Sequence, residues 1–273
     1  MARLCEGRVA IVTGGARGVG REHCLMLAEH GAKVVVNDLG GDRAGKGNDV
    51  GPAQQVVNEI KAKGGEAVAN GDDVSDWNGA KRMIDQAVSA FGKLDAVVLN
   101  AGILRDRMLV NMTEEEWDAV VKVHLKGTFA PARHAAAYWR DQAKLKGGPV
   151  DARIITTTSV SGIYGNIGQT NYGAAKAGIA SFTVIAAREL GRYGITVNSI
   201  SPSAFTRMTE DLREYSEEDK KRRDPKWIAP VATWLVSEDS REVTGRVFQA
   251  GKILTELAKK ARKNAGMNGL DLD

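Results

Sequence analysis

The chain has few cysteines and no long apolar run. Its 273 residues include two cysteines, Cys5 and Cys24, which are too few for a disulfide framework. No cluster of histidine and cysteine has the spacing of metal ligands, so the sequence implies no catalytic metal. No apolar run reaches the roughly 18 residues that cross a bilayer, and the first residues lack the charged and then apolar pattern of a signal peptide. We therefore expect a cytoplasmic protein without a membrane partner.

Aromatic residues are also scarce, at 5% of the chain, and no stacking pattern accompanies the basic runs 220–223 and 259–263. The net charge is +4, with 34 acidic residues interspersed among the basic ones. Proteins that hold nucleic acids combine a basic groove with aromatic side chains on which bases stack. We therefore expect no nucleic-acid partner and interpret the runs as solvated helix faces. A mild positive field suits small anionic ligands.

The size and the hydrophobic content, 43%, predict one large core. Short apolar segments alternate with helical ones, which is typical of a parallel sheet covered on both faces. We predict a single α/β domain over residues 1–273 with a Rossmann fold, in which ligands bind at the carboxyl ends of the strands of a doubly wound parallel sheet. The expected strands are 9–13, 33–38, 66–70, 94–100, 153–159, 195–201 and 246–250.

A glycine-rich turn follows the first expected strand. Gly14, Gly18 and Gly20 lie between the apolar segment 9–12 and a helical run at 21–30. Glycines let the backbone approach a dinucleotide pyrophosphate closely, and a helix N-terminus offers N–H groups and a positive dipole end. The order of strand, turn and helix predicts a dinucleotide site. The alternative is a tight turn that binds nothing.

The second expected strand ends at Asp38. A carboxylate at this place can accept hydrogen bonds from both ribose hydroxyls of an adenosine and would repel a 2′-phosphate. Asp38 therefore favours NAD over NADP as the cofactor. Arg17, within the glycine turn, is a cation that could contact a phosphate. Without the glycine turn, Asp38 would be interpreted as a turn former.

Tyr172 and Lys176 carry the chemistry that we expect. They lie four residues apart in a stretch, 168–190, that is predicted to be helical, so both side chains share one face. A lysine beside a phenol favours the phenolate and is expected to lower the tyrosine pKa toward neutrality, where it serves proton transfer. A solvated surface pair is the alternative. Ser159, thirteen residues before Tyr172, completes the set.

These motifs, in this order, resemble the short-chain dehydrogenase/reductase family over nearly the full length of the chain. The resemblance implies that Ser159, Tyr172 and Lys176 are catalytic and that the glycine turn binds the pyrophosphate of the cofactor. It places the adenine at Asp73 and Val74, and the floor beside the cofactor at Asn100, Ala101 and Gly102. The implied cofactor contacts are Gly14, Arg17, Gly18, Val19, Gly20, Asp38, Asp73, Val74, Asn100, Ala101, Gly102, Tyr172, Lys176 and Thr206.

Within the family, residues 36–41, 102–107 and 161–169 are similar to the dehydrogenase domains of type 2 multifunctional enzymes. This similarity implies NAD-dependent oxidation of a 3-hydroxyacyl-CoA with a fatty acyl or steroid side chain. A 3-oxoacyl carrier-protein reductase or a hydroxysteroid dehydrogenase is the alternative within the class. A catalytically silent NAD-binding regulatory subunit is the alternative outside it. The family resemblance also implies a homodimer or homotetramer.

His124 and the C-terminal segment depart from the usual family pattern, and two further segments have expected roles. His124 stands where the family has an asparagine that supports a proton relay, so we count it as a candidate catalytic residue. The alternative is a helix histidine whose hydrogen bonds are satisfied and which has no catalytic role. Residues 204–225 are expected to form a substrate lid. Residues 251–273 form an atypical basic C-terminal extension. The segment 40–51, with five glycines, is expected to be a mobile loop near the adenosine.

Overall fold

The computed structural model describes residues 3–205 and 216–251. Thr206 and residues 207–215 of the expected lid lie outside the described residues, as do residues 252–273 of the C-terminal extension. The roles that we expect for these segments stay predictions. No helix in the described part of the chain is long and apolar enough to cross a membrane.

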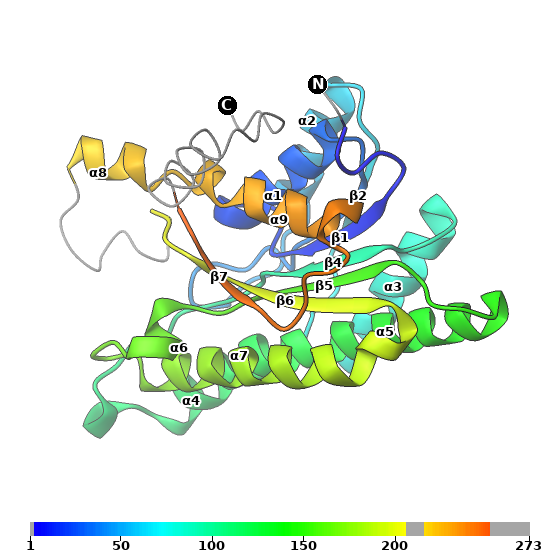
Figure 1. Cartoon of the computed structure of the whole chain (residues 1–273). Helices are drawn as coiled ribbons and strands as arrows, with labels where there is room; N and C mark the ends of the chain where they lie inside the picture. Colours follow the sequence, from blue (N-terminus) through cyan, green and yellow to red (C-terminus); the bar gives the residue numbers. More distant parts are fainter. Residues whose placement is uncertain (1–2, 206–215, 252–273) are drawn as a thin grey trace, which may run out of the picture.

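Seven parallel strands form one sheet in the order β3-β2-β1-β4-β5-β6-β7. The order reverses between β1 and β4, and in open α/β sheets ligands bind at the carboxyl ends of the strands at such a point. The sheet confirms the predicted Rossmann architecture (Figure 1). The strands are β1 Val9–Thr13, β2 Lys33–Asn37, β3 Ala67–Asn70, β4 Ala96–Leu99, β5 Ala152–Thr157, β6 Ile195–Pro202 and β7 Val247–Ala250.

Each expected strand exists, with ends displaced by a few residues at most. The largest displacements are two residues, at the end of β5 and at the start of β4, which begins at Ala96 rather than at Leu94. The carbonyl of Leu94 accepts a hydrogen bond from the Trp139 indole at 2.6 Å, and the Asp95 carboxylate accepts one from the backbone N–H of Val9 at 2.8 Å. Bonds to distant segments, one to the Trp139 side chain and one to the backbone of Val9, therefore hold this strand end, which local sequence does not reveal.

Helices cover both faces of the sheet, because both faces are apolar. In β1, Ala10 and Val12 face one core cluster, whereas Val9 and Ile11 face the other. Figure 1 shows α1, α2, α8 and α9 on one side of the sheet and α3 to α7 on the other. The helices are α1 Gly18–Glu29, α2 Gly51–Ala62, α3 Trp77–Phe91, α4 Glu114–Val121, α5 Gly127–Lys146, α6 Val160–Tyr164, α7 Thr170–Leu190, α8 Glu217–Arg222 and α9 Ala229–Val236.

Shorter helical turns complete the described chain. A π-helical turn, η2 Lys122–Lys126, joins α4 to α5. Such turns are rare and frequently occur at functional sites. The 3₁₀ turns are η1 Leu109–Asn111, η3 Gly191–Tyr193, η4 Pro225–Trp227 and η5 Glu238–Ser240.

The segment that we expected to be a mobile loop is folded against the chain after β4. Asp42 closes a turn by accepting hydrogen bonds from the N–H groups of Ala44 at 2.8 Å and Lys46 at 2.9 Å. The backbone N–H of Leu104 donates to the carbonyl of Arg43 at 3.1 Å. Loop 40–50 therefore lies beside the carboxyl end of β4, next to the candidate site.

Candidate active site

The glycine turn holds β1, α1 and β4 close together. A Cβ on Gly20 would overlap the carbonyl oxygen of Gly14, and a Cβ on Gly14 would lie 2.9 Å from the Cα of Ala101. Gly14 and Gly18 adopt positive φ angles of 64° and 51°, which other residues rarely adopt. Within the described residues no side chain caps the N-terminus of α1, and its first turn has no acidic residue. This end of α1 is therefore suited to an anion.

Asp38 lies just beyond β2, beside the glycine turn. Its carboxylate accepts hydrogen bonds from the backbone N–H groups of Ala16 at 3.0 Å and Gly40 at 2.8 Å. The Arg17 guanidinium donates to the carbonyl of Gly41 at 3.3 Å. The structure thus brings together the two residues on which the cofactor preference depends.

The expected adenine and floor residues also lie at this edge of the sheet. The Asp73 carboxylate accepts hydrogen bonds from the N–H and the hydroxyl of Ser75, both at 2.7 Å, and Val74 is buried. The Thr13 hydroxyl accepts from the backbone N–H of Asn100 at 2.9 Å. The Asn100 amide in turn donates to the carbonyls of Thr13 at 3.2 Å and Gly14 at 3.3 Å. These bonds join the ends of β1 and β4 into one surface.

The structure brings Ser159, Tyr172 and Lys176 together. Ser159 follows β5 and caps α6, and Tyr172 and Lys176 lie on successive turns of α7. The Lys176 ammonium is 5.5 Å from the centre of the Tyr172 ring and donates a hydrogen bond to the carbonyl of Thr157 at 2.7 Å. The predicted helix and the shared face are therefore confirmed.

The expected direction of the Tyr172 pKa is wrong. Burial raises the pKa of the Tyr172 phenol to about 12, although a hydrogen bond with Ser159 opposes this change; the charge of Asp106 adds to the rise. Burial also lowers the pKa of Lys176 to about 7. The lysine is only 3% exposed, so the same desolvation that disfavours the phenolate also disfavours its cationic partner.

His124 lies on η2 with its ring edge against Tyr172. The ring centres are 5.0 Å apart, and the planes are nearly perpendicular, at 88°. Its Nε2 is 2.8 Å from the carbonyl oxygen of Ile103 and 3.1 Å from the backbone nitrogen, so the tautomer decides which of the two it bonds. Nδ1 is buried and has no partner among the described residues. Burial, with the nearby Lys176 charge, lowers the His124 pKa to about 3, so the ring is neutral.

Comparisons with known proteins agree with this geometry. The family model for short chain dehydrogenases matches residues 8–218, which is more than half of the chain. The chain belongs to the short-chain dehydrogenase/reductase family. As a member, it is an oxidoreductase of the class that acts on CH–OH groups, with a fold that binds NAD or NADP.

Several relatives of this dehydrogenase are known. It is 46% identical over 252 residues to hydroxyacyl-CoA dehydrogenase ChsB1 of Mycobacterium tuberculosis, covering 89% of this chain and 77% of that one. It is 44% identical over 246 residues to a peroxisomal hydratase-dehydrogenase-epimerase of Neurospora crassa, covering 90% of this chain but 26% of that protein's length. A crystal structure of a short chain dehydrogenase from Mycobacterium avium superposes with a TM-score of 0.81 at 52% identity, covering 91% of this chain and 84% of that one.

The residues of this dehydrogenase fit a dinucleotide. The close packing at Gly14 and Gly20 brings the backbone to the place where a pyrophosphate binds, and the uncapped N-terminus of α1 supplies N–H donors. Asp38 lies at the end of β2, where ribose hydroxyls need an acceptor. The N–H donors of α1 and the Asp38 acceptor are therefore the groups that fit a dinucleotide.

One residue that positions the dehydrogenase's tyrosine was missed from the sequence. Asn171 is fully buried, and its amide donates hydrogen bonds to the carbonyls of Arg105 at 3.0 Å and Glu116 at 3.1 Å. Its side-chain oxygen accepts from the backbone N–H of Tyr172 at 2.7 Å. Asn171 thus ties the first turn of α7 to two distant segments. An asparagine at the start of an expected helix was the signal that could have identified it.

A second network near Tyr172 was also missed. The Gln169 amide donates to the Asp106 carboxylate at 2.7 Å, and its oxygen accepts from the Ser161 hydroxyl at 2.8 Å. Gln169 is 4% exposed. The backbone N–H of Arg107 donates to the carbonyl of Gly168 at 2.8 Å, so the segment after β4 is fastened to the start of α7. No local pattern connects these two segments, which are about sixty residues apart in the chain.

Proposed function

We propose that this dehydrogenase uses NAD to oxidise the 3-hydroxy group of a 3-hydroxyacyl-CoA to the 3-oxoacyl-CoA. The observation that carries the proposal is the meeting of Ser159, Tyr172 and Lys176 at the sheet edge that holds the glycine turn. Two relatives support the substrate class, since one is named a hydroxyacyl-CoA dehydrogenase and the other a hydratase-dehydrogenase-epimerase. A 3-oxoacyl carrier-protein reductase, a hydroxysteroid dehydrogenase and a silent NAD-binding subunit remain the alternatives.

The catalytic roles follow from the positions of the three side chains. The Ser159 hydroxyl donates a hydrogen bond to the substrate oxygen, and the Tyr172 oxygen takes the hydroxyl proton during oxidation or returns it during reduction. Lys176, held by the carbonyl of Thr157, directs a donor toward the cofactor ribose, and it carries a positive charge beside the phenol when the pH is below its lowered pKa of about 7. Bound NAD would supply the acceptor for the hydride that leaves the alcohol carbon.

His124 belongs to the same proposal as a residue that orients the proton path. Its neutral ring lies edge-on to Tyr172, and its Nδ1 is the buried ring nitrogen to which no described residue bonds. We propose a water molecule on this nitrogen as a link in the proton path, because buried waters bond to otherwise unpartnered polar atoms. The histidine then does the work of the asparagine that the family has at this place.

The preference for NAD over NADP rests on Asp38. Its carboxylate is held between the N–H groups of Ala16 and Gly40, and a 2′-phosphate would meet this negative charge. Arg17 lies close by, but its guanidinium already donates to the carbonyl of Gly41. We therefore propose NAD as the cofactor.

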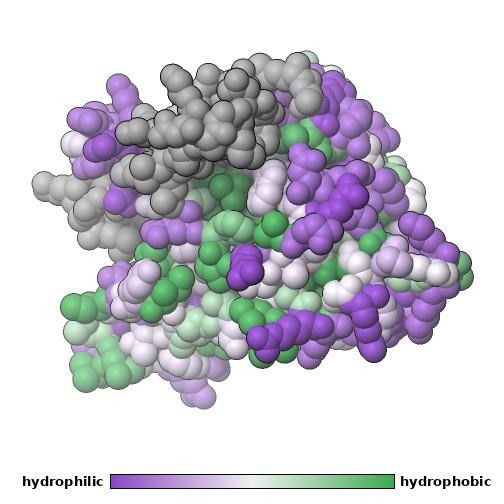
Figure 2. All heavy atoms as spheres, viewed as in Figure 1, coloured by the Kyte–Doolittle hydropathy of each residue, from purple (hydrophilic) through white to green (hydrophobic). Residues whose placement is uncertain are grey.

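The substrate is proposed to be bulky and apolar at its acyl end. Large exposed hydrophobic side chains gather on two segments next to the catalytic residues, and Figure 2 shows hydrophobic side chains over α6 and the segment that leads into α4. Exposed apolar patches of this kind mark binding surfaces. They suit a fatty acyl chain or a steroid side chain. The exposed residues are Met108, Leu109, Val110, Ile163, Tyr164 and Ile167.

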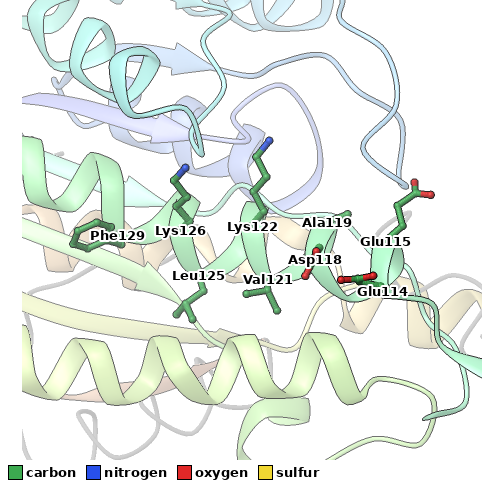
Figure 3. A pocket seen from close by; sticks show the side chains of 9 residues that line it. All are labelled: Glu114, Glu115, Asp118, Ala119, Val121, Lys122, Leu125, Lys126 and Phe129. Atoms are coloured by element: carbon green, nitrogen blue, oxygen red, sulfur yellow. The ribbon is translucent and has the colours of Figure 1, made fainter. Parts of the chain in front are cut away.

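We also propose a homodimer or homotetramer. A cavity of about 930 Å³ opens on the face of α4, η2 and α5, and Figure 3 shows its side chains, with Val121 and Leu125 directed toward α7. Phe129 lines this cavity and is 43% exposed. On α7, Ile179 is buried in the core, but Ile185 is 54% exposed. A second copy packed on this face would cover these apolar groups. Light scattering of the purified chain measures the mass that tests this.

The cellular location stays a prediction. We expect the cytoplasm, whereas the relative from Neurospora crassa is named peroxisomal. The part of that relative that this chain matches is about a quarter of its length, so its other activities are not transferred.

The test of the function is NADH formation from NAD with three kinds of substrate: 3-hydroxyacyl-CoA thioesters, a free hydroxysteroid and simple secondary alcohols. We expect turnover with the thioesters, rising with pH, because oxidation uses the phenolate and the Tyr172 pKa lies near 12. Tyr172→Phe should bind NAD as tightly as the parent and lose at least about a hundredfold in kcat. Turnover retained in Tyr172→Phe would contradict the catalytic assignment, and activity confined to the steroid would favour the alternative.

A further inference from the structure

A second cavity, with cations as half of its lining residues, opens near the helix that carries the catalytic tyrosine. Its volume is about 420 Å³, within the range of pockets that hold small molecules. Two segments build it: loop 40–50 and the chain that follows β4. Four of the eight lining residues are cations and two are carboxylates, so four minus two leaves a charge of +2. The lining residues are Arg43, Ala44, Lys46, Leu104, Arg105, Asp106, Arg107 and Glu116.

The two carboxylates of this cavity are occupied with neighbours. Glu116 accepts hydrogen bonds from the backbone N–H of Thr113 at 3.0 Å and from the Arg107 guanidinium at 2.9 Å. Those bonds lower the pKa of Glu116, so its carboxylate stays ionised, and the adjacent Arg107 guanidinium balances its negative charge. Asp106 accepts from the Gln169 amide at 2.7 Å. Two of the cations are paired as well, Arg107 with Glu116 at 2.9 Å and Arg105 with Glu115 at 2.8 Å. Arg43 and Lys46 are the other cations of the lining. Exposed ion pairs of this kind are weak enough to rearrange around an anion.

The Arg105 guanidinium and the backbone that carries Arg43 and Lys46 are held in place by hydrogen bonds. The Arg105 guanidinium donates to the carbonyl of Ala44 at 3.1 Å, and the Leu104 N–H donates to the carbonyl of Arg43 at 3.1 Å. The turn that Asp42 closes fixes the backbone on which Lys46 lies. Guanidinium and ammonium groups carried on such a fixed backbone are the chemistry that recognises phosphate.

The cavity is connected to the catalytic tyrosine through its wall. The carbonyl of Arg105 accepts a hydrogen bond from Asn171, which in turn accepts one from the backbone N–H of Tyr172. The N–H of Arg107 donates to Gly168, at the start of the loop into α7. Residues 105–107, which line the cavity, are therefore fastened to the first turn of the helix that carries Tyr172.

We propose that this cavity binds the phosphate groups of the substrate's coenzyme A. The inference rests on the proposed function, because coenzyme A carries its phosphates at the far end of a flexible arm from the reacting acyl group. The pyrophosphate of the dinucleotide is assigned to the N-terminus of α1, and none of the cavity residues belongs to that set. The cavity and the apolar patch on 108–110 and 163–167 would then hold opposite ends of one amphipathic substrate.

Calorimetric titration of the full chain, saturated with NADH, tests the site without turnover. The probes are coenzyme A, 3′-dephospho-coenzyme A and pantetheine. We expect coenzyme A to bind more tightly than its dephospho form and pantetheine to bind least, and the affinity for coenzyme A to fall as salt is added. Equal affinities of the three probes, or no binding of coenzyme A, would overturn the proposal.

Two charge-matched double variants locate the site. Arg43→Gln/Lys46→Gln removes two cations from the cavity, and Arg140→Gln/Lys144→Gln removes two from α5. The cavity variant should bind coenzyme A about tenfold more weakly, because charge-assisted contacts to phosphate are lost, whereas the α5 variant should bind it as the parent does. If the cavity variant does not fold, the single variant Lys46→Gln, whose side chain is exposed, should lose about threefold. Unchanged affinity in the cavity variants, or equal loss in the α5 variant, would refute the site.

Titration of the free double variants with NADP separates the two sources of phosphate. Weaker binding of NADP with unchanged binding of coenzyme A would assign the cations to the 2′-phosphate of a cofactor and overturn the proposal.

Turnover separates the proposed cavity site from the proposed function on which it rests. Equal kcat/KM for the thioester in both double variants would refute the cavity site alone. Binding of coenzyme A in the cavity without oxidation of any 3-hydroxyacyl-CoA would refute the function alone.

Discussion

Replacing Lys176 by methionine should stabilise the fold and abolish turnover. Lys176 is 3% exposed, and burial lowers its pKa from 10.5 to about 7. Each pKa unit corresponds to about 1.4 kcal/mol, so burial of the protonated lysine costs about 5 kcal/mol well below pH 7 and about 4 kcal/mol at pH 7. Methionine has a similar length and no charge, so it removes this cost.

The substitution also removes a hydrogen bond. The Lys176 ammonium donates to the carbonyl of Thr157 at 2.7 Å, and a buried acceptor that loses its donor costs about 1–3 kcal/mol. The two effects have opposite signs, and the desolvation term is the larger. We therefore expect Lys176→Met to be more stable than the parent by about 1–3 kcal/mol at pH 7.

The pH dependence identifies the cause. Since the folded pKa of Lys176 is lowered, the unfolded chain binds more protons between pH 7 and pH 10.5, and the parent gains stability as the pH rises through this window. The variant lacks this gain, so its advantage should shrink toward pH 10.5. The raised pKa of Tyr172, about 12, acts above pH 10 and is shared by both proteins.

Urea unfolding of parent and variant between pH 6 and about 9.5, at one protein concentration, measures the difference. Lys144→Met serves as the control, because this exposed lysine on α5 should change stability by less than about 0.5 kcal/mol at every pH. A variant that is less stable than the parent at pH 7, or a difference that does not vary with pH, would show that burial of Lys176 is not costly and would refute the reasoning.

Two further predictions concern the cofactor side and the histidine. Asp38→Ala should raise the ratio of kcat/KM with NADP to kcat/KM with NAD by about tenfold or more, because the carboxylate that repels a 2′-phosphate is gone. Steady-state kinetics with both cofactors measure this ratio. An unchanged ratio would contradict the role given to Asp38. Gly102→Ala should lower the free energy of unfolding by about 1–3 kcal/mol, because the added Cβ would overlap Cε1 of His124. In the same urea titration, the double variant Gly102→Ala/His124→Ala should recover part of this loss.

Local sequence determined the seven strands, the glycine turn and the helix that carries the catalytic pair. Short apolar segments set between helical ones can bury both faces only in a parallel sheet, and all seven expected strands are found in it. A spacing of four residues on a helix places Tyr172 and Lys176 on one face wherever that helix lies. These features depend on neighbours in the chain, so the pattern alone predicts them.

The tertiary structure decided how the site behaves. The sequence predicted a lowered pKa for Tyr172, but burial by distant segments raises it and lowers that of Lys176. Asn171 and Asp106 acquire their roles from bonds to residues about fifty to sixty positions away, and loop 40–50 becomes a cavity wall only because it packs on the chain after β4. Desolvation and long-range hydrogen bonds depend on which segments meet in space, and no local periodicity records that meeting.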